Sequence, residues 1–447
     1  MQNPPLEKPI QLGTVFRLWL PLAGSWLLMG VELPLFTAFV ARMADPEINL
    51  AAYGSVAFPI SLVIEGPVIM LLAAATALCS DWRSYRKVHR FMTVLSAILT
   101  AVHIAIAFTP LFELVVHTLL DVPEEVVEPA RLGLQIMTPW TWAIAYRRMH
   151  QGVLIRFERS QWVMLGTLVR LAVLLAVLVT GFAFKLGPGI AVGAGAVAAA
   201  VTAEAIFIRV ISAPILRDRL RPAPDLGKVK SWGAFLSFYV PLAMTPLLTL
   251  IIQPAGTAAM SRMPAELASL AAWPAVHSLV FLTRSSGFAF NEVVVALLGR
   301  EGGARALRRF GLLLAAVTMA VLLILGWTPL AGWWFGRVSG LNPELSRLSS
   351  QALLFAFLMP GYQAMQSWYQ GILVHRHRTR GITEGVLLYL VVALAGLSVA
   401  VAWGRFPGIF AALVAFSTGG VLQTLWLRHR AAPILAELPD SIDSSKS

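Results

Sequence analysis

The sequence predicts an all-α polytopic membrane protein in which twelve transmembrane helices form two six-helix lobes. Three observations lead to this fold class. The 447-residue chain is 57% hydrophobic and only 13% charged, whereas typical soluble domains carry roughly 25% charged residues. Apolar segments of about 20 or more residues, the length needed to cross a bilayer, recur along the whole chain. The second half of the chain also repeats the pattern of the first.

The repeat is visible in short motifs that recur at a constant spacing. The residues TPL at 109–111, PGI at 188–190 and APIL at 213–216 return at 328–330, 407–409 and 432–435, all three with the same offset. Nearer the start of each copy, RM at 42–43 and LAA at 50–52 return at 262–263 and 270–272, with an offset that is longer by a single position. One single-residue deletion between the second and third helices of the second copy reconciles the two offsets. Duplicated hydrophobic halves are typical of secondary transporters, whose substrate sites lie where the halves meet.

The apolar segments predict six spans in each repeat. They are residues 14–42, 50–79, 90–116, 130–156, 160–184 and 188–216 in the first repeat, and 234–259, 266–298, 306–334, 346–374, 382–403 and 406–428 in the second. We therefore expect an N-lobe at 1–220, a linker at 221–233 with proline and glycine among charges, a C-lobe at 234–430 and a polar tail at 431–447.

The charge of the loops alternates along the chain. Clusters of arginine and lysine follow the second, sixth, eighth and tenth spans, and the loop after the third span is acidic. We expect the protein in the inner membrane of the cell. The positive-inside rule then places both of its termini in the cytoplasm. Because each repeat has an even number of spans, the repeats are parallel and related by a pseudo-twofold axis along the membrane normal. The net charge of +12 is assigned to these loops, and we expect a lipid bilayer rather than nucleic acid as the partner.

Signatures of enzymes and metal sites are missing from the sequence. There is no Walker A lysine-serine loop, so we expect no ATP hydrolysis, no enzymatic activity and no cofactor. The His-Arg run at 375–378 has no neighbouring cysteine or carboxylate, so we expect no metal site there. The single cysteine, Cys79, excludes an intrachain disulfide.

A family resemblance enters at the fourth and tenth spans. The fourth span reads PWTWAIAY at 139–146 and then QGVL at 151–154, and the tenth echoes it with Pro360 and QGIL at 370–373. A proline-to-QGxL helix followed by a basic loop, once per six-helix half, resembles the multidrug/oligosaccharidyl-lipid/polysaccharide (MOP) exporter superfamily. Its twelve-span branches include the MATE transporters and the progressive ankylosis (ANKH) proteins, so the resemblance implies a MATE-like fold.

The sequence is most similar to the ankylosis branch. The residues that carry this likeness are the AAYG stretch at 51–54, the Gly66-Pro67 pair, the AIAY run at 143–146, Ser237-Phe238, and Glu32 at its spacing before Tyr53. In animals that family is associated with export of pyrophosphate, citrate or nucleotide. The resemblance therefore implies export of a small organic or phosphate-containing anion.

Ionisable residues inside the predicted spans are the candidate functional residues. A charged side chain near the bilayer centre costs about 2.5–3.5 kcal/mol, so such residues usually face a cavity and have partners. The first half holds Glu32, Glu65, Arg147, Arg148, His150, Arg170 and Glu204, and the second half holds His277, Arg284 and Glu292. At matched repeat positions, Tyr389 replaces Arg170 and Gln423 replaces Glu204. This difference predicts that ion chemistry belongs to the first lobe.

The basic residues of this set are the predicted substrate-binding residues. Guanidinium groups bind carboxylates and phosphates in a bidentate manner. We therefore assign substrate binding to Arg147, Arg148 and Arg284, with His150 nearby. The deep set contains four arginines against three carboxylates, which leans slightly towards an anionic substrate.

The acidic residues predict coupling to H⁺ or Na⁺. Glu32 has no partner in its own helix, and Pro34 loosens the backbone beside it, as suits a protonation site. We assign coupling to Glu32, Glu204 and Arg170. The alternatives are an Arg170–Glu204 pair that only holds the fifth and sixth helices together, and pairing of Glu32 with Arg147 or Arg148.

A gate between the lobes is predicted from Glu65 and Arg284. In the repeat alignment Glu65 corresponds to Ser285, beside Arg284. A Glu65–Arg284 bridge would close one side of the cleft between the lobes. Alternatively, Arg284 binds an anionic substrate and Glu65 is satisfied elsewhere.

The sequence thus predicts a monomeric secondary transporter that works by alternating access. The first rival is a MATE-type antiporter of cations or drugs, which requires a cleft that is net negative once ion pairs are subtracted. The second is a flippase of lipid-linked substrates, which requires a lateral opening lined by apolar residues. A membrane scaffold is a third class, in which substitution of the buried charges changes only stability.

Overall fold

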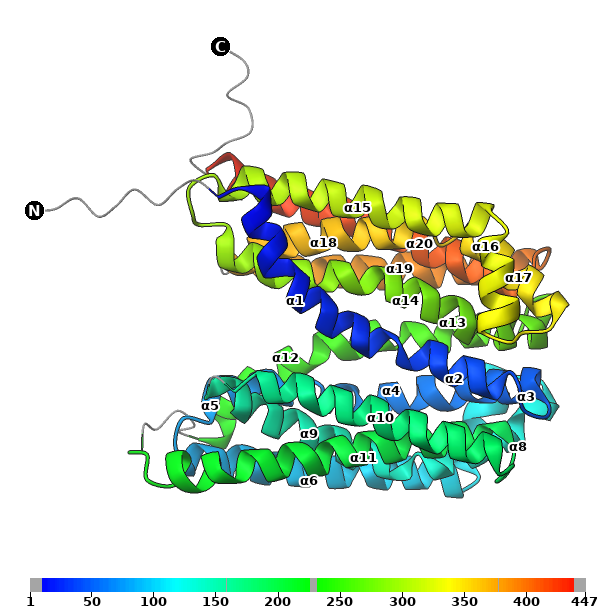
Figure 1. The fold of residues 1–447 in the computed structure, drawn as a ribbon, viewed down its shortest axis with the longest axis horizontal. Helices are drawn as coiled ribbons and strands as arrows, with labels where there is room; N and C mark the ends of the chain where they lie inside the picture. The colour runs from blue at the N-terminus through cyan, green and yellow to red at the C-terminus, as the bar shows by residue number, and fades with distance from the viewer. Residues whose placement is uncertain (1–9, 158, 226–230, 377, 438–447) are drawn as a thin grey trace, which may run out of the picture.

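The computed structural model describes residues 10–157, 159–225, 231–376 and 378–437, which form helices and no strand (Figure 1). Within these described residues, ten helical segments are long and apolar enough to span a membrane. The two remaining predicted spans correspond to α9 and α18, which occupy matched positions in the two repeats. The described part of the chain is therefore an all-α, multi-pass membrane protein of two repeated halves.

The first half runs from α1 to η4. Its elements are α1 (Leu12–Gly30), α2 (Glu32–Val40), α3 (Pro46–Ala51), η1 (Ala52–Ala57), α4 (Phe58–Glu65), η2 (Gly66–Val68), α5 (Leu71–Leu78), α6 (Trp82–Phe108), α7 (Leu111–Glu113), η3 (Leu114–Leu120), α8 (Glu124–Ile136), α9 (Thr138–Arg156), α10 (Gln161–Ala183), α11 (Gly189–Ile215) and η4 (Leu216–Leu220).

The second half runs from α12 to α20. Its elements are α12 (Trp232–Leu250), α13 (Ile252–Met260), α14 (Glu266–Leu297), α15 (Gly303–Trp327), α16 (Leu330–Trp333), η5 (Trp334–Val338), α17 (Pro343–Leu353), α18 (Leu358–His375), α19 (Arg380–Trp403) and α20 (Gly408–Ala436). We call the end of the molecule where α2 meets α3 the distal end (right in Figure 1), and the end where α1 begins the proximal end.

Four predicted spans and the predicted tail differ clearly from the structure. Residues 90–116 and 306–334 run past the ends of α6 at Phe108 and α15 at Trp327. Residues 130–156 and 346–374 are not single helices, because α9 starts anew beside Pro139 and α18 beside Pro360. Proline lacks the N–H that would continue the preceding helix, and it disfavours helical backbone in the residue before it. The tail predicted from residue 431 begins later, because α20 continues to Ala436 with Ile434 buried. Residues 226–230 of the linker and 438–447 of the tail lie outside the described residues.

Local geometry confirms the sequence repeat. The first span breaks at Val31 and the seventh at Ile251, which occupy equivalent positions in the two copies. The tie between the second and sixth spans is repeated as well. Asn49 Oδ1 accepts a hydrogen bond from Ile190 N at 2.9 Å, and Ser269 Oγ accepts one from Ile409 N at 3.3 Å.

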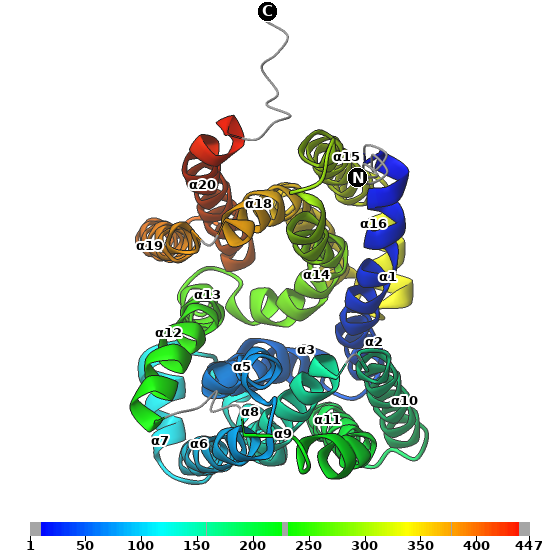
Figure 2. The same cartoon turned by 90° about the vertical axis from the view of Figure 1, so that its left-hand side faces the viewer.

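The first helix of each half crosses over to the other lobe (Figures 1 and 2). The indole of Trp19 in α1 donates to Ser286 O in α14 at 2.9 Å. The hydroxyl of Tyr239 in α12 donates to Pro67 O in the N-lobe at 2.6 Å. Trp19 and Tyr239 are repeat equivalents. The two lobes are therefore interlocked by an exchange of half-helices, with a helix break where each half-helix returns to its own lobe.

The lobes meet closely near the distal end, where α14 packs on α3 and η1. A Cβ on Gly54 would lie 2.0 Å from Pro274 Cγ, so only glycine permits this approach. Gly54 and Pro274 are themselves repeat equivalents. Beside them, Ser55 Oγ donates to Leu270 O at 2.7 Å and Thr257 Oγ1 donates to Ser55 O at 2.5 Å.

Candidate functional site

A buried network of charges joins four helices of the first half. Arg170 Nε lies 2.5 Å from Glu32 Oε1, and Arg147 Nη1 lies 2.7 Å from Glu204 Oε2. Arg170 Nη1 connects the two pairs, because it lies 3.6 Å from the same Glu204 oxygen. Gln151 Nε2 donates to the other Glu204 oxygen at 3.0 Å. The side chain of Glu204 is 0% exposed and that of Arg147 is 4% exposed, whereas that of Glu32 is 21% exposed, so the network is buried around Glu204 and partly accessible at Glu32.

The helix break in the first span positions the carboxylate of Glu32. Glu32 is the first residue of α2, directly after Val31, where α1 ends. Pro34 has no N–H to offer to the carbonyl of Gly30, so the backbone hydrogen bonding is interrupted at this point. Because α2 packs on α10, the partner of Glu32 is Arg170.

The network decides between two of the alternative pairings. Arg170 and Glu204 do form an ion pair between α10 and α11, as one interpretation of the sequence expected. Glu32 pairs with Arg170 and with neither Arg147 nor Arg148 among the described residues. The ion-coupling roles of these residues stay predictions, because the geometry shows their contacts and not their titration during transport.

In the second half, the contact equivalent to Arg147–Glu204 is made by uncharged side chains. In the repeat alignment, Gln366 matches Arg147 and Gln423 matches Glu204. Gln366 Nε2 donates to Gln423 Oε1 at 3.1 Å and to Gly420 O at 3.0 Å. The packing of this helix pair therefore requires a polar contact and does not require charge.

Two further arginines inside the spans, Arg148 in the N-lobe and Arg284 in the C-lobe, form no ion pair with a carboxylate among the described residues. Arg284 Nη2 donates to Gln363 Oε1 at 2.7 Å, and its guanidinium lies 5.6 Å from the ring centre of Tyr362 and 5.8 Å from that of Phe288. Arg148 is half-buried, and neither its Nε nor that of Arg284 has a hydrogen-bond partner. A buried guanidinium with an open donor is suited to bind an oxyanion.

Glu65 and Arg284 do not form the expected bridge in the described structure. Glu65, the last residue of α4, accepts a hydrogen bond from the indole of Trp140. Arg284 is engaged by Gln363, so Glu65 is satisfied elsewhere, as the alternative interpretation expected. The gate role of this pair stays a prediction for another conformation.

The charge balance of the deep set is positive once ion pairs are subtracted. Glu32 and Glu204 are balanced by Arg170 and Arg147. Arg148 and Arg284 then remain against the single carboxylate of Glu65. Glu292, exposed on α14, forms no ion pair with a member of this set and is not counted in it.

His150 lies within the N-lobe, among aromatic side chains. Its Nδ1 lies 2.9 Å from Tyr146 O, its Nε2 lies 3.4 Å from the hydroxyl of Tyr85, and its ring also contacts that of His89. These contacts fill both ring nitrogens. In this conformation His150 is engaged by its own lobe, and its substrate role stays a prediction.

Several polar residues of the site were missed in the sequence analysis. Gln363 and Tyr362 hold Arg284, Trp140 holds Glu65, and Gln151 completes the shell of Glu204. Gln151 and Trp140 belong to the motif of the fourth span, which was a usable signal. Gln363 had no signal, because a neutral residue three positions after a proline resembles any other helical residue.

No group of three or more potential metal-ligating side chains occurs in the part of the chain that the structure describes. Residue 377 of the His-Arg run lies outside that part. Two grooves lie elsewhere. One, of about 450 Å³, lies between α19 and α20, with Val392, Trp403 and Phe410 in its wall, and the other, of about 390 Å³, lies between α10 and α11. Neither groove is lined by a residue of the buried charge network.

Comparison with known proteins gives matches in structure alone. No protein-family model matches the chain, and no curated protein matches its sequence. The structure is similar to an inward-facing multidrug resistance MATE transporter of the MOP superfamily, with a TM-score of 0.73 and 14% identity over 94% of this chain and 99% of the other.

Two further solved structures show the same architecture. The lipid II flippase MurJ in an inward closed conformation matches with a TM-score of 0.70 and 14% identity, over 91% of this chain and 86% of the other. A MOP superfamily transporter from Pyrococcus furiosus matches with a TM-score of 0.63 and 15% identity, over 96% of this chain and 99% of the other. The chain is a multi-pass membrane protein with the MATE-like fold.

Proposed function

We propose that the protein is a secondary active transporter that exports a small organic or phosphate-containing anion, such as citrate or pyrophosphate, by alternating access between its two lobes. Both termini lie in the cytoplasm, and a single chain with both lobes forms the transporting unit. The observation that carries the proposal is the positive balance of the buried set. Neither Arg148 nor Arg284 forms an ion pair with a carboxylate among the described residues, and Glu65, which interacts with Arg148, is the remaining carboxylate of the set.

The balance of charge separates this proposal from a cation antiporter. A cavity for cationic drugs gains from surplus carboxylates and open aromatic faces. Here the aromatic faces of Tyr362 and Phe288 are already occupied by Arg284. The Pyrococcus furiosus neighbour is described by the reverse polarity of its binding pocket, which suggests a different function for that protein. The sequence likeness to the ankylosis family supports an anion as the substrate.

Glu32 and Glu204 provide a route to ion coupling. When Glu32 takes up a proton or binds Na⁺, Arg170 loses its nearest counter-ion, which lies 2.5 Å away. Arg170 then depends on Glu204, 3.6 Å away and already paired with Arg147. The first span carries Glu32 at its break, so this change in pairing is transmitted to the half-helix that crosses to the C-lobe. The coupling residues are thereby linked to the relative position of the lobes.

The substrate assignment is tested by counterflow into proteoliposomes. Labelled citrate and pyrophosphate are run beside a cationic dye, with Arg284→Ala and the wild type in parallel. We expect anion exchange in the wild type and a loss of roughly tenfold or more in Arg284→Ala, because the open guanidinium is removed. Arg305→Ala, at an exposed arginine near the start of α15, is the matched control and is expected to exchange anions normally.

Other outcomes would assign other substrates. Dye exchange with inert anions would move the protein to the drug-antiport class, with Glu32 and Glu65 as the ligands. Translocation of a lipid-linked diphosphate, with no exchange of free anions, would favour the flippase.

The coupling assignment is tested separately with Glu32→Gln. We expect this variant to fold and to lose transport driven by a proton or sodium gradient, while anion counterflow without a gradient persists. Transport that still responds fully to the gradient would contradict the role of Glu32.

A further inference from the structure

We infer that Arg42 and Arg262 form a two-part latch that holds the lobes together at the distal end. They are repeat equivalents, and each lies just past the end of the second segment of its crossing helix, α2 or α13. The inference rests on the proposed function, because it supplies the distal gate of the proposed transport cycle. It concerns residues outside the buried charge network.

Arg42 connects its own helix to the opposite lobe. Its Nη1 donates to Ala38 O at 2.5 Å, within the end of α2. Its Nη2 donates to Arg337 O at 2.5 Å, near the end of η5 in the C-lobe. One guanidinium therefore bridges the carbonyl ends of two helices that belong to different lobes. These ends carry partial negative charge, so a cation is favoured there.

Arg262 repeats this arrangement in the opposite sense. Its Nη1 donates to Ala258 O at 2.7 Å, and Ala258 is the repeat equivalent of Ala38. The same group lies 3.2 Å from Leu119 O, and Nη2 lies 3.5 Å from Thr118 O, near the end of η3 in the N-lobe. Thr118 is the repeat equivalent of Arg337. The latch therefore obeys the pseudo-twofold symmetry of the whole molecule.

The turns that Arg42 and Arg262 contact in the opposite lobe are also repeat equivalents of each other. Asp121 has φ +54° and its repeat equivalent Gly340 has φ +75°. Arg262 Nε lies 3.5 Å from Asp121 Oδ2. At Gly340, a Cβ would lie 2.6 Å from Arg42 Nη1, so the glycine leaves room for the guanidinium. On the N-lobe turn, the carboxylate of Asp121 attracts Arg262. On the C-lobe turn, Gly340 has no side chain, so the guanidinium of Arg42 fits beside it.

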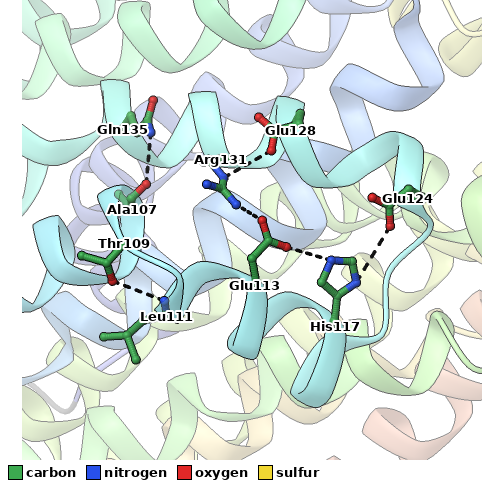
Figure 3. A network of polar contacts seen from close by, with 9 residues as sticks. All are labelled: Ala107, Thr109, Leu111, Glu113, His117, Glu124, Glu128, Arg131 and Gln135. Atoms are coloured by element: carbon green, nitrogen blue, oxygen red, sulfur yellow. Dashed lines mark hydrogen bonds and ion pairs between the residues drawn. The ribbon is translucent and has the colours of Figure 1, made fainter.

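The receiving turn of the N-lobe is held by its own polar network (Figure 3). Glu113 accepts from Arg131, and its other oxygen lies 2.8 Å from His117 Nε2. Arg131 Nε also lies 3.4 Å from Glu128. These contacts tie α7 to α8, and His117 of η3 also lies 4.0 Å from Glu124 of α8, so the carbonyl groups of η3 that Arg262 contacts are held in place.

A further hydrogen bond joins the two lobes at the distal end. Asn342 Nδ2 donates to Glu47 Oε1 at 2.5 Å, from the C-lobe to the N-lobe. The Oδ1 of the same asparagine caps α17 by accepting from Leu345 N at 2.8 Å. This contact has no repeat equivalent, because Leu267 and Pro123 stand at the matched positions.

The latch is suited to open and close. Arg42 is exposed and the side chain of Arg262 is 33% exposed, so each cross-lobe contact is worth little on its own. When the lobes separate, each arginine keeps its bond to its own helix, at Ala38 or Ala258. Opening therefore removes only the cross-lobe bonds and leaves each guanidinium positioned to form them again.

The latch is tested by measuring distances between spin labels with pulsed electron paramagnetic resonance in reconstituted protein. In a Cys79→Ala background, one label pair replaces Glu125 and Glu344 at the distal end, and a second replaces Arg86 and Arg305 at the proximal end. Each pair consists of exposed repeat equivalents. The variant is Arg42→Gln with Arg262→Gln. Its matched control is Arg83→Gln with Arg217→Gln, two exposed arginines whose ion pairs with Asp225 and Asp218 do not cross between the lobes.

In the latch variant we expect the population with a long distal distance to rise roughly 5- to 10-fold, and the control to match the wild type. Unchanged distal distances would overturn the inference. Gly340→Asn is a second variant, since asparagine tolerates positive φ but fills the space of Arg42, and a smaller shift in the same direction is expected.

The readout requires no substrate. If the distances shift while every anion is inert in counterflow, the latch stands and the proposed function fails. If anion exchange is intact in the latch variant and the distances do not move, the proposed function stands and the latch fails.

Discussion

At the scale of single residues, the two lobes make an equivalent helix–helix contact with different side chains, an ion pair in the N-lobe and a neutral hydrogen bond in the C-lobe. The N-lobe joins α9 to α11 by Arg147 and Glu204, and the C-lobe joins α18 to α20 by Gln366 and Gln423. Both contacts fill the same place in their repeat. Because a neutral pair suffices in the C-lobe, the buried charges of the N-lobe have another use, which we propose is ion coupling.

This comparison predicts the outcome of a double-mutant cycle. Glu204→Gln is expected to lower the free energy of unfolding by about 3–5 kcal/mol, since it leaves the buried Arg147 without a carboxylate. Arg147→Gln is expected to lower it by less, because Glu204 still lies 3.6 Å from Arg170. The double variant is expected to recover most of that loss, because it recreates the glutamine pair of the C-lobe. The measurement is unfolding in detergent.

A loss in the double variant equal to the sum of the two single losses would refute this account. Arg83→Gln, which removes an exposed ion pair, is the control and is expected to cost less than about 1 kcal/mol.

At the scale of elements, the broken first span connects the charge network to the movement of the lobes. Its first part, α1, is fixed to the C-lobe by the bond from Trp19 to Ser286. Its second part, α2, is fixed to the N-lobe by the ion pair of Glu32 with Arg170. Any rotation of one lobe against the other must therefore bend the chain near Val31, where Pro34 has already removed a backbone hydrogen bond.

Restoring that hydrogen bond is expected to slow transport. Pro34→Ala supplies the missing N–H and stiffens the break, so we expect turnover to fall several-fold while the melting temperature rises. Initial rates of anion exchange and thermal unfolding measure the two effects. Pro433→Ala, inside α20 and away from the crossing helices, is the control and is expected to leave turnover unchanged. A Pro34→Ala variant with normal turnover would exclude bending at this break from the rate-limiting step.

At the scale of the whole molecule, the pseudo-twofold repeat determines the topology. Both halves have the same direction, so matched residues lie at the same end of the molecule. The distal end holds the acidic turn around Glu124 and Glu125, and the proximal end holds basic loops such as those near Arg86 and Arg305. The positive-inside rule therefore predicts that the proximal end lies in the cytoplasm.

Cysteine accessibility in intact cells tests this orientation. In a Cys79→Ala background, single cysteines at Glu125 and Glu344 are expected to react with a membrane-impermeant maleimide, and cysteines at Arg86 and Arg305 only after permeabilisation. All four positions are exposed in the structure. Reaction at the two members of one matched pair from opposite sides of the membrane would rule out parallel repeats.

Much of the fold was predictable because its causes are local. The length of an apolar segment, the charge of a loop and a repeated motif are all readable along the chain, and the repeat of the motifs reappears in the matched helix breaks. The breaks before α9 and α18 were missed, although Pro139 and Pro360 indicated them. An apolar segment alone does not distinguish a continuous helix from two shorter ones.

The sequence by itself determined the class of protein, the parallel repeat and the set of residues whose charge is costly in a membrane. Only the tertiary structure decided which of these residues are paired, that Arg148 and Arg284 form no ion pair in the described part of the chain, and that Arg42 and Arg262 meet the opposite lobe. The physical reason is the range of the forces involved. Burial follows from the composition of each segment, whereas an ion pair depends on which faces of helices far apart in the chain pack together.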